Sequence, residues 1–307
     1  MSGALRRASD WAMTHWTVWI LASSFFLALY DLAKKASVGG NAVLPVLFFS
    51  TCFGCASYAA SLAVCGGFGA AAAHLAPDVV ALAAVKVMIV GTSWVFTFRA
   101  LRTLPISIAT PIRASAPALV FLMAFVLYGE RPGVLQAVGM AAVFVGYFAF
   151  SWAGRYEGID FFRDRAVWCA IAGAACSALS SIWDKYLFQV RGLSVESVQL
   201  VFQVGLVVFY GTALAVCRMG RGLKCGEFEW RWTIPCVGIL LAAADWLYFH
   251  GLAYPDAPVS AASLMRRFSV VITFVLGAKF FHETNLVRKA AALAAILVGI
   301  VLICLGG

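Results

Sequence analysis

The stretch from Pro105 to Glu130 reads PISIATPIRASAPALVFLMAFVLYGE, and the stretch from Pro258 to Glu283 reads PVSAASLMRRFSVVITFVLGAKFFHE. The two align without a gap when the chain is shifted by 153 residues, which is about half of its length. The identical pairs are Pro105 and Pro258, Ser107 and Ser260, Ala109 and Ala262, Arg113 and Arg266, Phe121 and Phe274, and Glu130 and Glu283. Each stretch is long and apolar enough for one membrane-length helix, with an arginine about a third of the way along it. The pair predicts an internal duplication around which the other helices are arranged.

The composition of the chain is that of an integral membrane protein. Of its 307 residues, 63% are hydrophobic and only 12% are charged, whereas a soluble domain carries roughly 25% charged residues. A chain this apolar cannot cover itself with polar surface, so its solvent is lipid. The net charge of +9 comes from short loops between apolar runs and not from a basic domain. It therefore predicts no nucleic-acid partner.

Ten segments of the chain are long and apolar enough to cross a bilayer, which takes about 20 residues each. They are residues 16–36, 43–65, 78–101, 105–128, 133–153, 166–190, 197–217, 233–253, 257–281 and 286–305. The sequence thus predicts an all-α polytopic membrane protein with ten transmembrane helices.

The polar loop RYEGIDFFRDR divides these segments into two sets of five. We expect an N-terminal tail at 1–15, a first five-helix repeat at 16–153, a connecting loop at 154–165 and a second repeat at 166–305. Because five is an odd number, the second repeat enters the membrane from the opposite face, which is the inverted-repeat architecture of many secondary transporters.

The positions of the cations predict a membrane orientation. Loops on the N-terminal side carry four cations, Arg6, Arg7, Arg131 and Arg191. Loops on the other side carry fourteen. Since cytoplasmic loops are enriched in Lys and Arg, the charge count places both termini outside.

The cysteines and histidines show no cluster typical of catalysis or metal binding. Nine cysteines are scattered through the apolar segments, and Cys52 and Cys55 form a C-x-x-C without a second pair or a nearby histidine. We interpret them as packing residues, with redox or metal chemistry as the alternative. No cofactor and no metal are expected.

The ten-segment pattern resembles the drug/metabolite transporter superfamily, and within it the EamA-like branch of five plus five helices. The matching features are the tandem repeat, the short loops and the endings LYGERPGVLQAVGMAAVFVGY (127–147) and FFHETNLVRKAAALAAILVGI (280–300). The second ending departs from the family pattern at His282 and Thr284. The resemblance implies a secondary transporter or exporter of small organic metabolites, with helices 3, 4, 8 and 9 lining the path. It also implies cytoplasmic termini, opposite to the charge count.

Ionisable residues within apolar spans are costly, at least about 2.5–3.5 kcal/mol each on insertion scales, and so they normally face a cavity or a partner. Arg113 and Arg266 fall near mid-depth and would offer planar donors to an anionic substrate. Lys86 and Arg267 would add positive charge, and Asp245 would orient an arginine or bind an amine or a proton. The predicted apolar walls of this substrate site are Trp94, Phe98, Trp246 and Tyr248.

The alternative interpretation is that these charges pair with each other. Arg113 or Arg266 would then pair with Asp245, and Lys185 would pair with Asp184 at the rim of its helix. Asp31 and Asp184 are candidates for coupling or gating, or are solvated near the helix ends. Glu130 and Glu283 are interpreted as lying at the membrane interface. Pro105 and Pro258, which open their helices, are further candidates for gating.

The sequence favours a secondary transporter of small organic metabolites that works by alternating access across a central cavity. An excess of cations over acids within the spans indicates an anionic or zwitterionic substrate. The alternatives are a broad-specificity efflux protein, a channel or a scaffold, and an enzyme is disfavoured. The expected partners are the substrate, a proton or counter-substrate, and the lipid bilayer of the cell (inner) membrane, with the protein a monomer or a homodimer.

Overall fold

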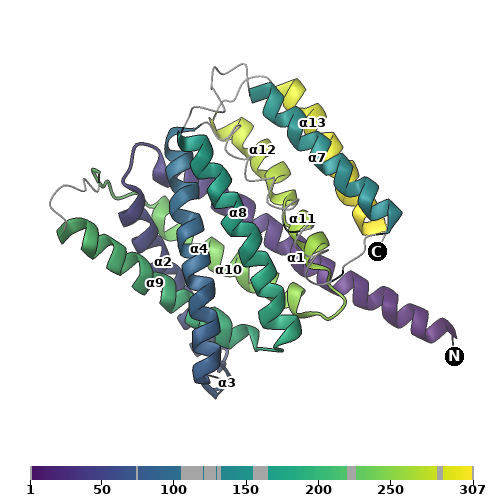
Figure 1. The fold of residues 1–307 in the computed structure, drawn as a ribbon, viewed down its shortest axis with the longest axis horizontal. Helices are drawn as coiled ribbons and strands as arrows, with labels where there is room; N and C mark the ends of the chain where they lie inside the picture. The colour runs from purple at the N-terminus through teal and green to yellow at the C-terminus, as the bar shows by residue number, and fades with distance from the viewer. Residues whose placement is uncertain are drawn as a thin grey trace.

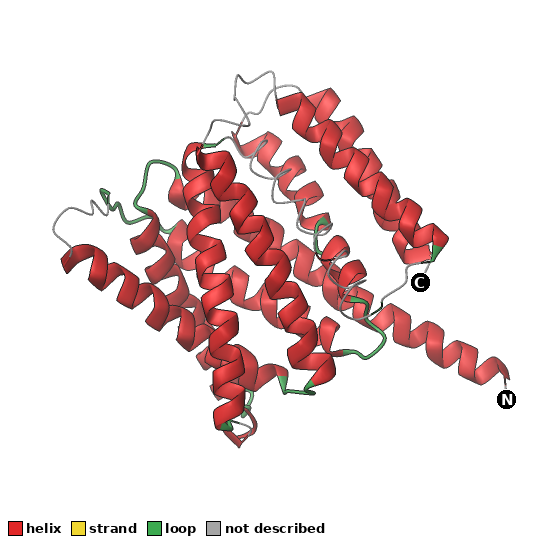
Figure 2. Ribbon diagram, viewed as in Figure 1, coloured by secondary structure: helices red, strands yellow, loops and turns green. Residues whose placement is uncertain are grey.

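The computed structural model describes residues 2–73, 75–104, 133–154, 165–219, 226–281 and 286–305, together with positions 120 and 129. These residues form helices joined by short connections, without a strand among them (Figure 2). Six of the described helices are long and apolar enough to cross a membrane: Trp16–Val38, Val43–Val64, Pro77–Thr103, Arg165–Val190, Val195–Met219 and Thr233–Ala253. The all-helical, multi-pass class is confirmed. Ten spans and the inverted repeat remain predictions.

The first half of the chain contains α1 (Ser2–Val38), α2 (Val43–Val64), the short α3 (Phe68–Ala73), α4 (Pro77–Thr103) and α7 (Val134–Gly154) (Figure 1). Four of the predicted segments fall on α1, α2, α4 and α7. The predicted tail at 1–15 is helical from Ser2 onward and continues into α1. The predicted helix 105–128 lies outside the described residues except for Val120. Pro105 and Arg113 are therefore also outside the described residues.

The second half contains α8 (Arg165–Lys185), α9 (Val195–Met219), α10 (Thr233–Ala253), α11 (Val259–Met265), α12 (Phe268–Phe281) and α13 (Leu286–Leu305). A π-helical turn, η2 (Tyr186–Val190), extends α8 directly. In this turn the Arg191 amide donates to the Tyr186 carbonyl five residues earlier, at 2.9 Å. Wider turns of this kind are frequent at functional sites.

One predicted element is corrected by the structure. The sequence predicts a single helix over 257–281, but the helix is interrupted at Arg266 and Arg267, between α11 and α12. Here the Ser269 amide donates to the Arg266 carbonyl at 3.3 Å and the Val270 amide to the Arg267 carbonyl at 2.8 Å, so the bonds reach back three residues instead of four. Apolarity and length do not reveal this break, because all of the flanking residues are compatible with a helix.

Helices from the two halves are interleaved. α1 packs against α10 and α12, α4 packs against α8 and α9, and α2 packs against α10. α7 and α13 pack on each other along one edge of the molecule (Figure 1). Hydroxyls also link the halves: Ser23 donates to the Ala244 carbonyl at 2.7 Å, and Ser93 donates to the Gly173 carbonyl at 2.8 Å.

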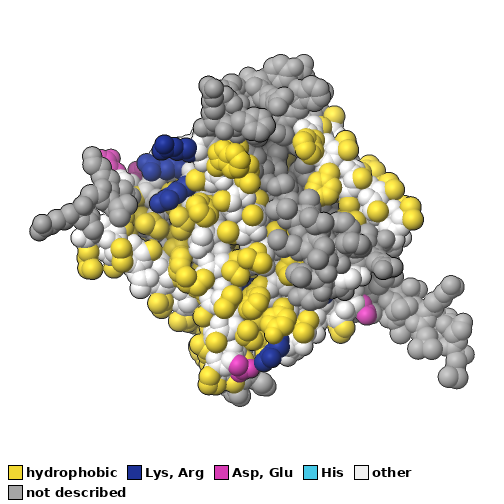
Figure 3. Space-filling model, viewed as in Figure 1, with side chains coloured by type: hydrophobic (Ala, Val, Ile, Leu, Met, Phe, Trp, Pro, Cys, Tyr) yellow, Lys and Arg dark blue, Asp and Glu magenta, His cyan; other side chains and the backbone are white. Residues whose placement is uncertain are grey.

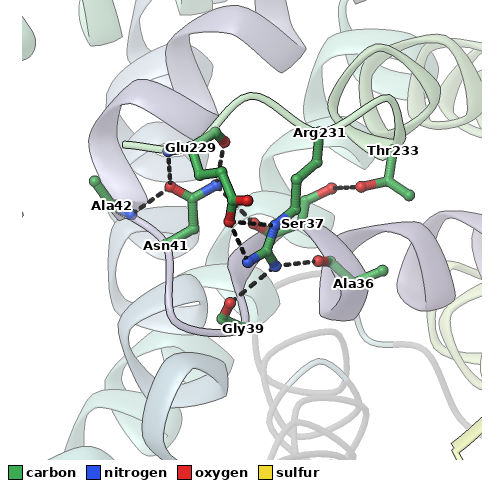
Figure 4. A network of polar contacts seen from close by, with 8 residues as sticks. All are labelled: Ala36, Ser37, Gly39, Asn41, Ala42, Glu229, Arg231 and Thr233. Atoms are coloured by element: carbon green, nitrogen blue, oxygen red, sulfur yellow. Dashed lines mark hydrogen bonds and ion pairs between the residues drawn. The ribbon is translucent and has the colours of Figure 1, made fainter. Parts of the chain in front are cut away.

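A polar network fastens the turn between α1 and α2 to the extended segment 226–232 (Figure 4). The Asn41 amide group donates to the carbonyls of Ser37 and Glu229 at 3.2 and 2.7 Å, and its oxygen accepts from the Ala42 and Glu229 amides at 2.8 and 3.0 Å. Arg231 donates to the Ala36 and Gly39 carbonyls at 2.8 and 2.9 Å. These bonds satisfy carbonyls that are left unpaired where α1 ends.

The described charges are unevenly distributed between the two ends of the bundle. Arg99, Arg102 and Arg218 are exposed at the end where α4 and α9 finish, and dark-blue side chains gather there in Figure 3. At the opposite end Arg191 pairs with Asp78 at 3.0 Å. Both chain termini lie at this second end (Figure 1).

Candidate functional site

A cavity of about 130 Å³ opens between helices of the two halves, and α1, α4, α8, α9, α10 and the α11–α12 break all contribute to its lining. Eight of the residues singled out from the sequence line it: Lys86, Trp94, Phe98, Asp184, Asp245, Tyr248, Arg266 and Arg267. Residues from both halves of the chain therefore converge on one site.

The first ion pair in the cavity joins α4 to α8. Lys86 is 1% exposed, and its ammonium donates to the carboxylate of Asp184, which is 4% exposed. Both side chains are therefore removed from solvent, where an unpaired charge would be costly. The expectation that Asp184 is solvated at a helix rim is wrong. Asp184 is instead held inward, against the next helix.

The second ion pair lies at the interruption between α11 and α12. The Arg266 guanidinium donates to the Asp245 carboxylate of α10 and lies 4.3 Å from the centre of the Tyr248 ring. The expected pairing of Arg266 with Asp245 is thus present in the structure. Because the helix breaks at this point, Arg267 also lines the cavity, although a continuous helix would turn it about 100° away from Arg266.

A third ion pair belongs to α1 alone. The Lys34 ammonium donates to Asp31 at 2.5 Å, and it lies 4.3 Å from the centre of the Tyr30 ring and 5.6 Å from that of Phe98. Asp31 is 6% exposed and Lys34 only 2%, so the expectation of a solvated Asp31 is also wrong. Lys34 is one of the fourteen cations that the sequence places in loops on the side opposite the N-terminus. The signal that could have found it is its spacing of three residues from Asp31 on one helical face.

The cavity also has a hydroxyl-rich wall that sequence reasoning did not assign to the site. Its members are Ser93, Thr97, Ser177, Ser180, Ser181 and Ser263. The run of small residues AIAGAACSALSS (170–181) indicates close helix packing, but only the fold shows that its hydroxyls face a cavity. Such groups can donate to or accept from a polar ligand without adding charge.

Some of the predicted residues lie elsewhere. The Trp246 ring packs against Trp19, with ring centres 5.7 Å apart, and against His250 at 4.2 Å, and it does not line the cavity. Pro258 immediately precedes α11, and its carbonyl accepts from the Ala262 amide at 2.9 Å in the first turn. Arg113, Pro105 and Glu130 are outside the described residues, as is Glu283.

Within the described residues, the charged groups around this cavity combine four cations with three carboxylates. The cations are Lys34, Lys86, Arg266 and Arg267, and the carboxylates are Asp31, Asp184 and Asp245. Aromatic rings from α1, α4, α9 and α10 complete the lining. The site can therefore hold a small polar molecule that competes for these ion pairs. Because the cations outnumber the carboxylates by one, the site favours a negatively charged ligand.

Comparisons with known proteins agree with this architecture. Residues 14–152 match the family model described as "EamA-like transporter family". No match is found among curated proteins. Among solved structures 28 chains match. One of them, described as "Crystal structure of protein", has a TM-score of 0.69 at 19% sequence identity. The match covers 94% of this chain and 96% of the other chain. At this identity the likeness shows the fold alone.

Proposed function

Because residues 14–152 match the model of the EamA-like transporter family, which is part of the drug/metabolite transporter superfamily, we propose that the protein is a secondary transporter of small organic metabolites. It carries anionic or zwitterionic substrates through the cavity between its halves, in the cell (inner) membrane. The observation that carries the proposal is two ion pairs on the cavity wall, the buried pair of Lys86 with Asp184 and the partly buried pair of Arg266 with Asp245.

Arg266 is the principal substrate-binding residue of this proposal. Its guanidinium carries a fork of donors that fits a carboxylate or a phosphate, and Asp245 occupies part of that fork in the substrate-free protein. A substrate anion would take the place of Asp245, and Arg267 would add charge from the same turn. Asp245 released in this way is available for an amine of a zwitterionic substrate.

The break between α11 and α12 supports a moving site. Transporters commonly place interrupted helices at the membrane midplane, where exposed backbone groups line a cavity. Ser24 of α1 donates to the Met265 carbonyl at 3.1 Å, just before the break. In the proposed cycle of alternating access, substrate binding at Arg266 changes the angle at this break. The two halves, as inverted five-helix repeats, rock around the site, driven by a proton or counter-substrate.

A ligand screen on purified full-length protein tests the substrate class. Small carboxylates, phosphates and zwitterionic amino acids are added singly, and the unfolding temperature is measured, because a ligand that binds the folded state raises it. We expect a stabilising anion or zwitterion for the wild type and a binding constant weakened at least about 30-fold by Arg266→Ala, since removing one partner of a buried charge pair costs 2 kcal/mol or more.

The matched control for this screen is Arg191→Ala, which removes a cation from an exposed ion pair at the end of the bundle. Transport of the same ligand into proteoliposomes should be lost in Arg266→Ala and kept in Arg191→Ala. Equal stabilisation by organic cations and by anions, or unchanged transport in a folded Arg266→Ala protein, would show that the proposed substrate class is wrong.

A further inference from the structure

The ammonium of Lys86 sits in a cage made of one carboxylate and three aromatic rings. The centres of the Phe249, Phe202 and Phe188 rings lie 3.7, 4.9 and 5.9 Å from its nitrogen. All three phenylalanines are at most 4% exposed. The cage residues come from four different elements, since Asp184 is on α8, Phe188 on η2, Phe202 on α9 and Phe249 on α10.

This combination is the chemistry by which proteins recognise organic cations. Ring faces attract a cation through their quadrupole, and aromatic cages bind alkylammonium groups in this way. The Asp184 carboxylate supplies the opposite charge and accepts a hydrogen bond from the ammonium. Such a site is built from the tertiary structure, because its four side chains converge from α8 with η2, from α9 and from α10.

The π-helical turn is part of the construction. Phe188 is on η2, directly after the α8 residues that carry Asp184. In an α-helix, residues four apart lie on one face about one turn apart. Asp184 and Phe188 have this spacing, and the Phe188 ring lies 5.9 Å from the same ammonium that Asp184 binds. Phe188 therefore closes the cage on the side of Asp184.

The other lysine at the cavity is held differently. Lys34 pairs with Asp31 on its own helix, three residues away, and contacts two rings. Lys86 instead reaches from α4 into a pocket made entirely by other elements. The geometry of Lys86 is therefore that of a tethered ligand, whereas Lys34 and Asp31 form a local pair.

We propose that Lys86 is the specificity-determining residue of the cavity, because its side chain permanently occupies a built-in site for an organic ammonium ion. The protein rejects alkylammonium substrates since the carboxylate and rings that would bind them are already filled. This inference refines the substrate class of the proposed function and rests on it, as Lys86, Asp184, Phe202 and Phe249 all line the same cavity.

Replacement of Lys86 by alanine removes three methylene carbons and the ammonium nitrogen and keeps the β-carbon. The vacated space then has the shape and charge preference of n-propylammonium. Added n-propylammonium should bind there, restore the contact with Asp184 and stabilise the folded protein.

The test is chemical rescue of purified, full-length Lys86→Ala protein. Its unfolding temperature is measured with increasing n-propylammonium, with tetramethylammonium as a second cation and with n-propanol as an uncharged molecule of similar shape. We expect a saturable rise of about 3 °C at ten times the dissociation constant for the cations. No saturable rise is expected with n-propanol, nor for the wild type with any of the three compounds.

Two control variants locate the effect. Lys86→Ala/Asp184→Asn removes the carboxylate and should not respond to either cation, while Lys34→Ala removes the other cavity lysine and should show a smaller response or none. If folded Lys86→Ala protein is not stabilised by either cation, or if the double variant responds equally, the proposal is wrong.

A second measurement covers the case in which Lys86→Ala does not fold without a ligand. The yield of monodisperse protein is then compared with and without n-propylammonium during solubilisation and purification, and an unchanged yield overturns the proposal. Both measurements report binding at one site and not transport. Rescue can therefore succeed where the anion screen fails, and the anion screen can succeed where rescue fails. The role of Lys86 and the proposed transport of anions are thus tested separately.

Discussion

At the scale of single residues, the molecule keeps its charges within the apolar interior by pairing them across helices. Lys86 and Asp184 are both almost fully buried, and neither could remain charged there alone at moderate cost. Burial of this kind is weak evidence for stability, because desolvation offsets the attraction between the charges. It is stronger evidence for a specific arrangement of α4 against α8.

A double-mutant cycle measures this coupling. We expect Asp184→Leu and Lys86→Met, each made alone, to lower the free energy of unfolding by about 3–5 kcal/mol, because each leaves one charge buried without its counterion. Lys86→Met/Asp184→Leu should cost much less, since it removes both charges and retains volume. Denaturant unfolding in detergent gives the values. Additive effects of the single changes would contradict a direct interaction.

The tryptophans test which part of the predicted aromatic wall belongs to the site. Trp94 lines the cavity, whereas Trp246 packs against Trp19 and His250 outside it. Trp94→Leu should therefore change the apparent affinity for a transported ligand by several-fold while the protein stays folded. Trp246→Leu should lower the unfolding temperature and leave the affinity unchanged. Proteoliposome uptake and thermal unfolding on the same preparations distinguish the two.

At the scale of elements, the interruption between α11 and α12 and the π-helical turn after α8 are the departures from regular helix that shape the site. The first brings Arg266 and Arg267 to the same cavity, and the second carries Phe188, whose ring lies 5.9 Å from the Lys86 ammonium. Both halves of the chain contribute a helix with an acidic residue at equivalent positions, Asp31 and Asp184, yet their lysine partners come from different places. The site is therefore asymmetric at the level of its ion pairs.

The segment 226–232 illustrates how a loop is made rigid. The rings of Phe228 and Trp230 pack against Phe49 of α2, with ring centres 5.3 and 5.7 Å apart. The polar network around Asn41 and Arg231 holds the other side (Figure 4). Aromatic contacts to α2 and hydrogen bonds to the end of α1 thus hold this segment in place.

We expect Asn41→Ala to destabilise the protein by about 1–3 kcal/mol, because it leaves buried backbone groups without partners. Hydrogen exchange at residues 226–232 should increase at the same time. The matched control is Thr212→Ala, whose hydroxyl is exposed and bonds only within its own helix, to Val208 and Phe209. Equal effects of the two variants would mean that the network does not hold the segment.

At the scale of the whole molecule, the question is which end of the bundle faces the cytoplasm. The exposed arginines at the ends of α4 and α9 favour that end as cytoplasmic. Cys217, in the last turns of α9, is disulfide-bonded, and disulfides persist in oxidising compartments, which favours the opposite orientation. The resemblance to EamA-like transporters also implies that the termini are inside.

Reporter fusions resolve the orientation. Because both termini lie at the same end of the structure (Figure 1), a fluorescent protein and alkaline phosphatase fused in turn to each terminus should give the same answer for both. Fluorescence with both fusions means that the termini are cytoplasmic and that the end of the bundle with Cys217 faces outward. Phosphatase activity with both fusions means the reverse orientation. Opposite results at the two termini would contradict an even number of spans and the five-plus-five arrangement.

The sequence alone was sufficient for the class of protein and for the places of most of the long helices among the described residues. Apolar runs of membrane length can only be helical in lipid, since every backbone group must be paired within its own segment. The predicted segments accordingly fall on described helices, apart from 105–128, which the structure does not describe. The pairing of Arg266 with Asp245 was among the expected alternatives because both residues lie near mid-depth in their helices.

Only the tertiary structure decided which charges meet and where a helix breaks. Lys86 reaches Asp184, 98 positions away in the sequence, and no local pattern encodes such a contact. The interruption at Arg266 and Arg267 likewise follows from what surrounds it, because a helix can open only where a cavity or a neighbouring group satisfies its backbone. Local sequence determines burial in lipid through apolarity and length, whereas an ion pair depends on distances between helices that only the packed fold establishes.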